Sequence, residues 1–324
     1  MTPMPRHIKP MLAKLAALPS DQRQWAFEYK WDGVRAILYW DGSRLSIDSR
    51  NLLDITPRYP ELAGLCDALG SRPAVLDGEI VALDSAGRVS FGQLQYRMHV
   101  VDDAKIARLA RTTPVYYMVF DLLHLGGEST LALPYARRRT MLEDLSLKGP
   151  NWQTPPSKVG DGTAMLQSVR SAGMEGLIAK RIDSRYEPGG RSGAWLKIKI
   201  SASQELVIGG YLPGQGMLTG GLGSVLVGYY RSGQDKLQYA GAVGTGYTDA
   251  FRRQLQKMLD AVASPQNPFS GAVPRGTVFC QPKYVCEVSF TEWTADGIVR
   301  HPVFKGLRLD KDPAQVVRES AVNS

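Results

Sequence analysis

The sequence predicts an α+β protein in two domains: antiparallel sheets with flanking helices over residues 1–201, and a small β-barrel over residues 202–324. A chain of 324 residues is long enough for two domains. Short segments in which apolar and polar residues alternate, as they do in half-buried strands, recur along it. After Ser201 the chain becomes rich in glycine and in strand patterns, so we place the boundary there.

The first domain opens with strand patterns. Residues 25–50 are expected to form a β-hairpin, with Phe27 and Tyr29 alternating with polar neighbours in its first strand. Asp41-Gly42 predicts a turn before a further strand at residues 45–48. A short helix is expected at residues 60–69. Apolar runs at 74–76 and 80–83 then flank the segment Asp77–Glu79.

The middle of the first domain alternates strands and helices. Residues 115–123 form a strongly apolar strand candidate that nevertheless contains Asp121. A helix is predicted over 134–145, with three arginines on its polar side: Arg137, Arg138 and Arg139. A second helix over 163–172 is followed by Gly173, a typical C-terminal cap. Strands are expected at 176–181 and 194–200.

The second domain reads as several short strands and one helix. Strand patterns occur at 207–211, 224–230, 236–243, 278–290 and 298–304. Thr248 and Asp249 can cap the helix, and apolar residues line one of its faces. This combination in roughly 120 residues predicts a small barrel such as an OB-fold.

Composition narrows the partners and the compartment. The net charge of +8 and the pI near 9.3 favour a polyanionic partner, with nucleic acid first. The three cysteines, Cys66, Cys280 and Cys286, lack the paired spacing of metal ligands. Their odd number argues against a disulfide framework. Cys280 and Cys286 are expected to face the same side of one strand and to pack in the protein core. There is no apolar signal region and no membrane-spanning stretch, so a cytoplasmic protein without a membrane partner is expected.

Lys30 is the most informative residue. Alone, Lys30 before Asp32-Gly33 also fits a solvated lysine beside a hairpin turn. A lysine can, however, attack the α-phosphorus of a nucleoside triphosphate once its amine is neutral. At a reference pKa of about 10.4 it is almost wholly protonated at neutral pH. Nearby cations such as Arg35, Lys197 and Lys199, with a bound metal, would disfavour the charged amine and neutralise the phosphate oxygens.

Six short segments accompany Lys30 in a fixed order, and a seventh lies near the C-terminus. They are Glu28–Arg35, Ser49–Asn51, Leu76–Glu79, Val119–Asp121, Glu175–Lys180, Trp195–Lys199 and Arg308–Lys311. Each alone has an ordinary structural explanation. Their ordered combination resembles the motif set of ATP-dependent DNA ligases, in the covalent nucleotidyltransferase superfamily. The resemblance covers nearly the whole chain and implies a nucleotidyltransferase (adenylation) domain followed by an OB-fold domain.

The resemblance implies a role for each matched residue. Lys30 is the nucleophile that becomes linked to AMP, and the other catalytic residues are Lys197, Lys199, Arg308 and Lys311. The residues implied to contact the nucleotide are Glu28, Lys30, Arg35, Arg50, Glu79, Phe120, Ile178, Lys197 and Lys199. Glu28 would help read the adenine, with Phe120 and Ile178 on its two faces. Mg²⁺ or Mn²⁺ would bind at Glu79 and Glu175. Arg308, Asp310 and Lys311 would orient the leaving pyrophosphate.

The resemblance also implies the substrate. The segments Tyr186–Lys197 and Gly297–Phe304 resemble bacterial stand-alone repair ligases and the ligase module of bacterial end-joining ligases. They imply a monomer that seals 5′-phosphate/3′-hydroxyl nicks in duplex DNA, associated with the nucleoid and with end-joining or repair proteins. The candidate segments for clamping the DNA are Leu212–Gly223 and Arg97–Arg111, and the sequence does not decide between them. An RNA ligase, a GTP-dependent mRNA-capping-type enzyme and an inactive nucleic-acid-binding protein are the alternatives.

Overall fold

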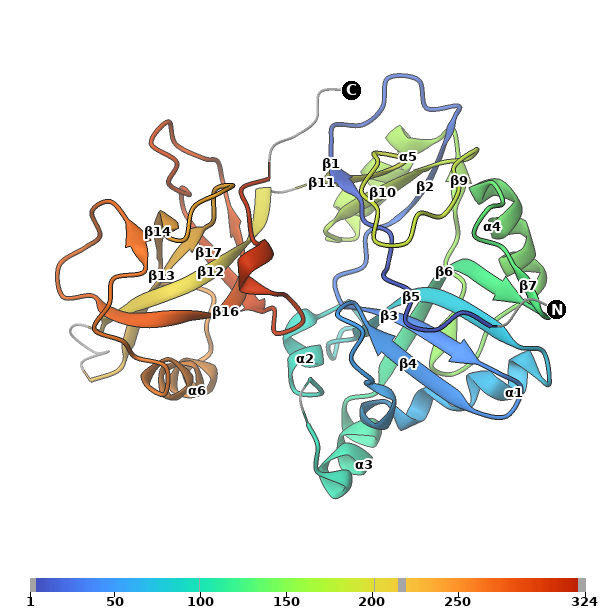
Figure 1. The fold of residues 1–324 in the computed structure, drawn as a ribbon, viewed down its shortest axis with the longest axis horizontal. Coiled ribbons are helices and arrows are strands. Elements are labelled where there is room, and N and C mark those ends of the chain that lie inside the picture. Colours follow the sequence, from blue (N-terminus) through green and yellow to red (C-terminus); the bar gives the residue numbers. More distant parts are fainter. Residues whose placement is uncertain (1–3, 99, 201, 215–219, 320–324) are drawn as a thin grey trace. The chain divides into compact units, whose positions relative to one another are not determined.

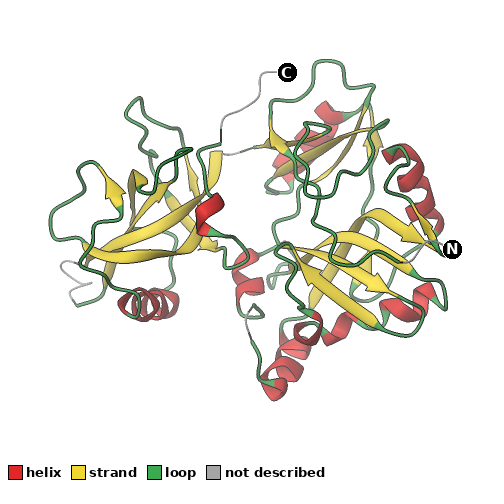
Figure 2. Cartoon of the chain, in the orientation of Figure 1, coloured by secondary structure: helices red, strands yellow, loops and turns green. Residues whose placement is uncertain are grey.

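A computed structural model of the chain describes residues 4–98, 100–200, 202–214 and 220–319. The chain forms two compact units that divide after Ile200. The first is the N-terminal unit and the second is the C-terminal unit (Figure 1). Strands dominate both, with helices on their outsides (Figure 2).

The N-terminal unit contains two sheets. The first has five strands in the order β1 (Lys14–Leu15), β11 (Trp195–Lys199), β10 (Gly176–Arg181), β2 (Trp25–Tyr29) and β9 (Lys158–Val159). The second has the order β4 (Leu45–Ser49), β3 (Val34–Trp40), β5 (Ala74–Ala82), β6 (Val115–Leu125) and β7 (Glu128–Ser129). A further short strand, β8 (Trp152–Gln153), pairs with β6 beside this row. Most pairs in both sheets are antiparallel, as the sequence predicts.

Helices flank the two sheets. Helix α5 (Gly162–Ser171) packs on β10 and β2, and α4 (Tyr135–Asp144) packs on β6 (Figure 1). Gly173 follows α5 with φ 64°, the left-handed conformation of a helix-ending glycine. The other helical elements are the 3₁₀ turns Thr56–Arg58 and Pro60–Leu62 and the helices α1 (Leu65–Leu69), α2 (Phe91–Gln95) and α3 (Asp103–Thr112).

The hairpin expected at residues 25–50 is wrong in its first half. β3 and β4 do form a hairpin across Asp41-Gly42, but β2 pairs with β10 and β9 in the other sheet. The chain therefore crosses from one sheet to the other between Tyr29 and Val34. Gly33 permits the crossing, because a Cβ there would lie 2.2 Å from the carbonyl oxygen of Ile80. Alternation predicts strands but does not state which strands pair.

A second feature of the sheets concerns Asp77–Glu79. The apolar runs on either side and the segment between them belong to one continuous strand, β5, a point that the sequence pattern left open. Gly78 is needed for packing, since a Cβ would lie 2.5 Å from the ring of Tyr117 on β6. The Tyr117 hydroxyl donates to the carbonyls of Ala36 and Leu76, so its ring crosses the sheet at that point.

The C-terminal unit is one strongly curled six-stranded sheet. Its order is β15 (Phe269–Ser270), β14 (Leu237–Val243), β13 (Leu222–Tyr229), β12 (Ala202–Pro213), β16 (Val278–Phe290) and β17 (Val303–Leu307). Helix α6 (Asp249–Asp260) begins at Thr248, whose side chain accepts from the N–H of Phe251, as predicted. A 3₁₀ turn at Pro313–Gln315 lies near the end. Cys280 and Cys286 are fully buried on β16, as expected.

Within the described part of the chain, no helix is both long enough and apolar enough to cross a membrane.

Candidate active site

Lys30 lies in the crossover between the two sheets of the N-terminal unit. Its backbone N–H donates to the carbonyl of Gly176 at 2.9 Å, which ties it to the start of β10. Its ammonium forms an ion pair with Glu175, whose other oxygen lies 3.7 Å from Nζ of Lys199. All three side chains are less than a fifth exposed. The structure thus brings together a predicted nucleophile, a predicted metal ligand and a predicted phosphate contact.

The strand register places further predicted residues on the same side. Ile178 on β10 pairs with Glu28 on β2 and with Lys197 on β11. Directly paired residues in antiparallel strands share a face of the sheet. Residues two apart on one strand also share a face, which adds Lys199. Glu28, Ile178, Lys197 and Lys199 therefore form one patch beside Lys30.

Glu28 is buried and held by two close donors, with a third cation farther away. Lys180 lies 2.9 Å from one carboxylate oxygen, the Tyr135 hydroxyl donates to the other, and Arg139 lies 3.8 Å from it. Nη1 of Arg139 is buried, without a hydrogen-bond partner among the described residues. A buried carboxylate needs such partners to remain charged. The orientation of Glu28 is therefore fixed from within the protein.

Lys180 itself is almost completely buried. Its ammonium lies 4.3–4.9 Å from the ring centroids of Phe120, Tyr135 and Trp195, and donates to the carbonyl of Phe120. Burial lowers the pKa of Lys180 below its ordinary value, although the Glu28 carboxylate opposes the shift. Lys180 is the last residue of the segment Glu175–Lys180, but no role for it followed from the sequence. The apolar neighbours Leu177–Ala179 are the signal that could have identified it as a buried cation.

Phe120 and Arg35 occupy the space between the sheets. The Arg35 guanidinium lies 4.6 Å from the Phe120 centroid and is held by both oxygens of Asp77, at 2.6 and 2.7 Å. Burial alone would lower the pKa of Arg35, but the Asp77 carboxylate outweighs burial and raises it. Phe120 is 8% exposed, with Arg35 and Lys180 against its ring. The predicted nucleotide contacts of both residues stay predictions, and this arrangement suits packing and positioning.

Glu79 lies on strand β5 of the second sheet, and Arg50 lies just beyond the end of its strand β4. Arg50 directly follows β4, in a loop that Ser49 closes by accepting from the backbone N–H of Leu53 at 3.2 Å. Glu79 pairs in register with Arg35 and Met118 on the neighbouring strands. Both lie in or beside the sheet opposite the one that carries the patch around Lys30.

Arg308, Asp310 and Lys311 form a cluster in the C-terminal unit. Arg308 donates to both oxygens of Asp310 at 3.0 Å, and Lys311 forms an ion pair with Glu205 at 2.7 Å. The backbone N–H of Arg308 donates to Val285 on β16 at 2.7 Å. The two cations are thus fixed to the curled sheet by carboxylates of their own unit.

Two interpretations of basic residues are wrong. Arg138 and Arg139, expected on the polar side of α4, are buried. Arg138 makes a bidentate pair with Asp121, the carboxylate that stood out in an apolar strand. Arg97, at one end of a predicted DNA clamp, is 1% exposed and bound to Glu61. Helical spacing cannot reveal a buried partner on another element.

The other proposed clamp segments are only partly described. On α3 the cations Lys105, Arg108 and Arg111 are exposed, so this part of the Arg97–Arg111 segment remains open to solvent. Residues 215–219 of the Leu212–Gly223 segment lie outside the described residues.

The residues around Lys30 fit a phosphate-bound divalent cation better than a cation bound by protein alone. No group of three His, Cys, Asp or Glu side chains that could hold a metal occurs among residues 4–98, 100–200, 202–214 and 220–319. Mg²⁺ commonly binds through one or two carboxylates and takes its other ligands from substrate phosphates and water. Glu175, beside Lys30 and Lys199, fits that kind of site.

Comparisons with known proteins agree with this arrangement. Residues 10–199 match the model of an "ATP dependent DNA ligase domain", and residues 218–311 match an "ATP dependent DNA ligase C terminal region". The α+β fold with a C-terminal OB-like region is therefore confirmed.

Individual relatives give the same result. DNA ligase C1 of Mycolicibacterium smegmatis is 33% identical over 333 residues, which cover 96% of this chain and 93% of that protein. The multifunctional non-homologous end joining protein LigD of the same organism is 40% identical over 320 residues, 97% of this chain. The chain spans only 40% of the length of LigD. A structure of mycobacterial DNA ligase D complexed with ATP and MES is 38% identical, with a TM-score of 0.71, and covers 96% of this chain and 98% of that one.

Proposed function

The chain belongs to the ATP-dependent DNA ligases, and we propose that it seals 5′-phosphate/3′-hydroxyl nicks in duplex DNA through AMP linked covalently to Lys30. The observation that carries this proposal is the cluster of Lys30, Glu175 and Lys199, with Lys197 and Glu28 on the same sheet face. An amine, a carboxylate and further cations are the groups that a reaction with a nucleoside triphosphate needs, which supports the proposal.

The first step forms a bond between Nζ of Lys30 and the α-phosphorus of ATP, and breaks the bond from that phosphorus to the pyrophosphate oxygen. An ammonium has no lone pair, so the ion pair with Glu175 holds Lys30 in an unreactive form. The lysine must leave Glu175 and lose a proton before it attacks. Lys197 and Lys199 then stabilise the negative charge that develops on the α-phosphate oxygens.

Glu175 and Glu79 are the side chains that would hold a divalent cation. Bound there with phosphate oxygens as its other ligands, Mg²⁺ or Mn²⁺ would supply charge neutralisation. Lys30 would be released whenever Glu175 turns from it to another cation.

In the later steps the adenylate moves from Lys30 to the 5′-phosphate of the nick. The 3′-hydroxyl then attacks that phosphate and AMP leaves. Similarity to LigD over part of its length supports a role in DNA repair, with other repair or end-joining proteins as partners. The basic charge of the chain supports salt-dependent DNA binding.

Labelling with radioactive nucleotide tests the proposal. Wild-type protein should acquire label from α-labelled ATP and not from GTP, whereas Lys30→Ala should acquire none. Lys30→Ala should still seal a nick whose 5′-phosphate already carries AMP, because that substrate bypasses the lysine. Normal labelling of Lys30→Ala would contradict the assignment of Lys30 as the residue that carries AMP. Labelling of the wild-type protein by GTP would favour the capping-type alternative. A nicked RNA duplex sealed faster than nicked DNA would favour an RNA ligase.

Arg308 and Lys311 are proposed to act mainly in the first step, on the pyrophosphate. Replacing either with alanine should lower the adenylation rate by about 10²-fold or more, as removal of a charge-stabilising group usually does. Sealing of pre-adenylated nicks should change far less. If adenylation were intact and only sealing were blocked, this division of labour would be wrong.

A further inference from the structure

Helix α6 is held rigidly on the C-terminal unit. Leu255 and Leu259 on its inner face are fully buried in the core. Arg252 donates to the carbonyls of Leu222 and Gly223 at 2.7 and 3.0 Å, and lies 4.8 Å from the ring centroid of Tyr247. The outer face of the helix is therefore presented in one fixed orientation, which lowers the entropic cost of binding to it.

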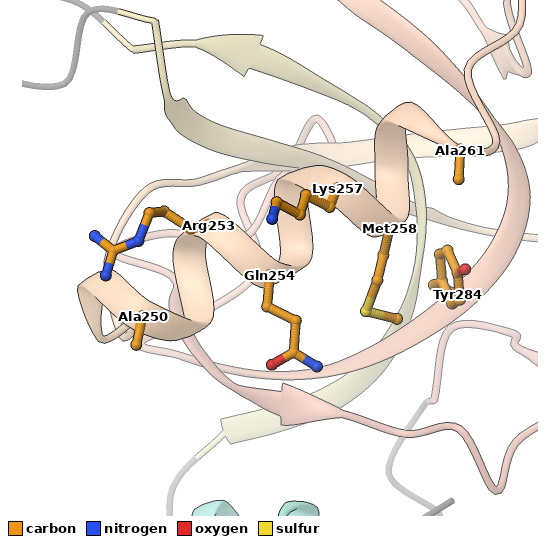
Figure 3. A pocket seen from close by; sticks show the side chains of 7 residues that line it. All are labelled: Ala250, Arg253, Gln254, Lys257, Met258, Ala261 and Tyr284. Atoms are coloured by element: carbon orange, nitrogen blue, oxygen red, sulfur yellow. The ribbon is translucent and has the colours of Figure 1, made fainter.

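A hollow of about 620 Å³ lies between this outer face and strand β16 (Figure 3). One wall is a stripe of helix residues at three- and four-residue spacing that runs from Ala250 to Ala261. The other wall is Tyr284 of β16, toward which Met258 points (Figure 3). We call this feature the α6 hollow.

The α6 hollow combines an apolar lining with cationic edges. Met258 and the Tyr284 ring supply apolar surface, and methionine adapts to ligands of different shape. Arg253 and Lys257 project beside them and are exposed. Lys283 adds a third cation, with its Nζ 5.9 Å from the Tyr284 ring centroid.

Carboxylates are absent from the lining itself. The residues that form the walls, all within the described part of the chain, include no Asp or Glu. The nearest acidic residues on the helix are at its two ends. Asp249 lies at the first position, and Asp260 accepts a hydrogen bond from the Tyr211 hydroxyl at 2.6 Å. The charge that a ligand meets in the hollow is therefore positive.

From this complementarity we propose that the α6 hollow is a docking site for a short acidic segment of a partner protein that carries an apolar or aromatic side chain. The apolar side chain would enter between Met258 and Tyr284. Its flanking carboxylates would pair with Arg253, Lys257 and Lys283 at the edges. Aromatic and aliphatic anchors in a pocket with charged surroundings are the usual source of affinity in such contacts.

A DNA backbone suits the α6 hollow less well. Phosphates gain from the cations but gain nothing from a concave apolar lining between Met258 and Tyr284. OB-folds bind nucleic acid mainly through their strands and loops rather than through this helix. The proposed contact is independent of the chemistry at Lys30, because α6 contributes no residue to that site.

Fluorescence anisotropy with a labelled peptide tests the proposal on the full chain. The probe is a short synthetic peptide in which Leu-Phe pairs alternate with Glu-Glu pairs. The charge reversal Arg253→Glu with Lys257→Glu should weaken its binding at least about tenfold, equivalent to about 1.4 kcal/mol. The matched control reverses two exposed arginines elsewhere on the same unit, Arg231→Glu with Arg275→Glu, and should leave the affinity within about twofold.

Further measurements separate the alternatives. A peptide with serine in place of Leu and Phe should bind more weakly, and Tyr284→Ala should weaken binding of the Leu-Phe peptide. AMP labelling of Lys30 should be normal in every variant, so a failure of the ligase assignment would appear separately. The proposal is overturned if wild-type protein does not bind the peptide, or if the control reversal weakens binding as much as the hollow reversal does. If Arg253→Glu with Lys257→Glu lost binding to nicked duplex or single-stranded DNA while its peptide binding stayed unchanged, the α6 hollow would instead be a nucleic-acid surface.

Discussion

The N-terminal and C-terminal units bury different chemistry. Among the described residues, the acidic, lysine and arginine residues that are buried as whole residues are Glu28, Asp48, Asp77, Arg97, Asp121, Arg138, Arg139 and Lys180, all in the N-terminal unit. In the C-terminal unit the buried polar side chain is Gln204. The apolar core of the N-terminal unit is divided into three clusters, whereas that of the C-terminal unit forms one.

The difference follows from what each unit positions. Buried charges are costly unless they are paired and hydrogen-bonded, and paired charges orient one another strictly. Lys180 and Tyr135 fix Glu28, and Asp77 fixes Arg35, at the edge of the patch around Lys30. In the C-terminal unit the charged residues are less deeply buried; the side chains of Arg308 and Lys311 are each 11% exposed. Its core can therefore be almost wholly apolar.

Breaking a buried pair in the N-terminal unit should have the largest effect on stability. Arg138→Met leaves the Asp121 carboxylate, fully buried, without its partner. Uncompensated buried charges of this kind cost about 3–5 kcal/mol of unfolding free energy. Denaturant unfolding followed by circular dichroism would measure the loss. A cost below about 1 kcal/mol would contradict the view that these charges hold the unit together.

The double substitution Asp121→Leu with Arg138→Met provides the matched control. It removes both charges, so most of the stability should return, since apolar replacements of buried pairs are often neutral. The carbonyls of Leu133 and Ser184, which also accept from Arg138, limit the recovery.

The C-terminal unit should respond to lost volume rather than to lost charge. Leu255 is fully buried in its single apolar cluster, so Leu255→Ala should cost about 3 kcal/mol by leaving a cavity. Gln254→Ala, on the exposed face of the same helix, should cost almost nothing and serves as the control. Equal costs for the two variants would mean that the core does not pack as described.

The contrast between the units also explains what the sequence could predict. The helix at Thr248, the buried cysteines and the order of segments around Lys30 follow from local patterns, and the structure agrees. The pairing of β2 with β10 and the burial of Arg138 depend on elements distant in sequence. Asp121 stood out as an acidic residue within an apolar strand, but nothing in the sequence pattern indicated Arg138 as its partner.

Pairing also determines how much of the site could be predicted. The order of the motifs assigned Lys30, Glu175 and Lys199 to one predicted site, and in the structure Glu175 forms ion pairs with both lysines. The motif order gave no role to Lys180, the last residue of the segment Glu175–Lys180, and did not indicate Tyr135, although both touch Glu28 from separate elements. The residues proposed to react stand out by type and order, whereas the residues that orient them become visible only through contacts.

A milder test of that orienting role is Tyr135→Phe. It removes the hydroxyl that donates to Glu28 and should cost about 1 kcal/mol of stability. If Glu28 reads the adenine, the KM for ATP should rise more than kcat falls, and discrimination against GTP should weaken. Tyr96→Phe, whose side chain is largely exposed, should change none of these. Unchanged nucleotide kinetics in Tyr135→Phe would limit its role to packing.

The smallest expected effect concerns the ion pair of Arg308 with Asp310 in the C-terminal unit. Burial alone would raise the pKa of Asp310, but the charge and hydrogen bonds of Arg308 outweigh burial and lower it. A carboxyl group with a lowered pKa stabilises the folded state above its unfolded pKa of about 4, and this stabilisation is lost as the pH falls through the folded value. Asp310→Asn should therefore lower stability at pH 7 while flattening its decline on acidification. Unfolding curves for the two proteins between about pH 2 and 7 would check this, with Asp296→Asn, an exposed carboxylate of the same unit, as control. An equally steep acid decline in Asp310→Asn would show that the buried charges of the N-terminal unit alone determine the acid sensitivity of the protein.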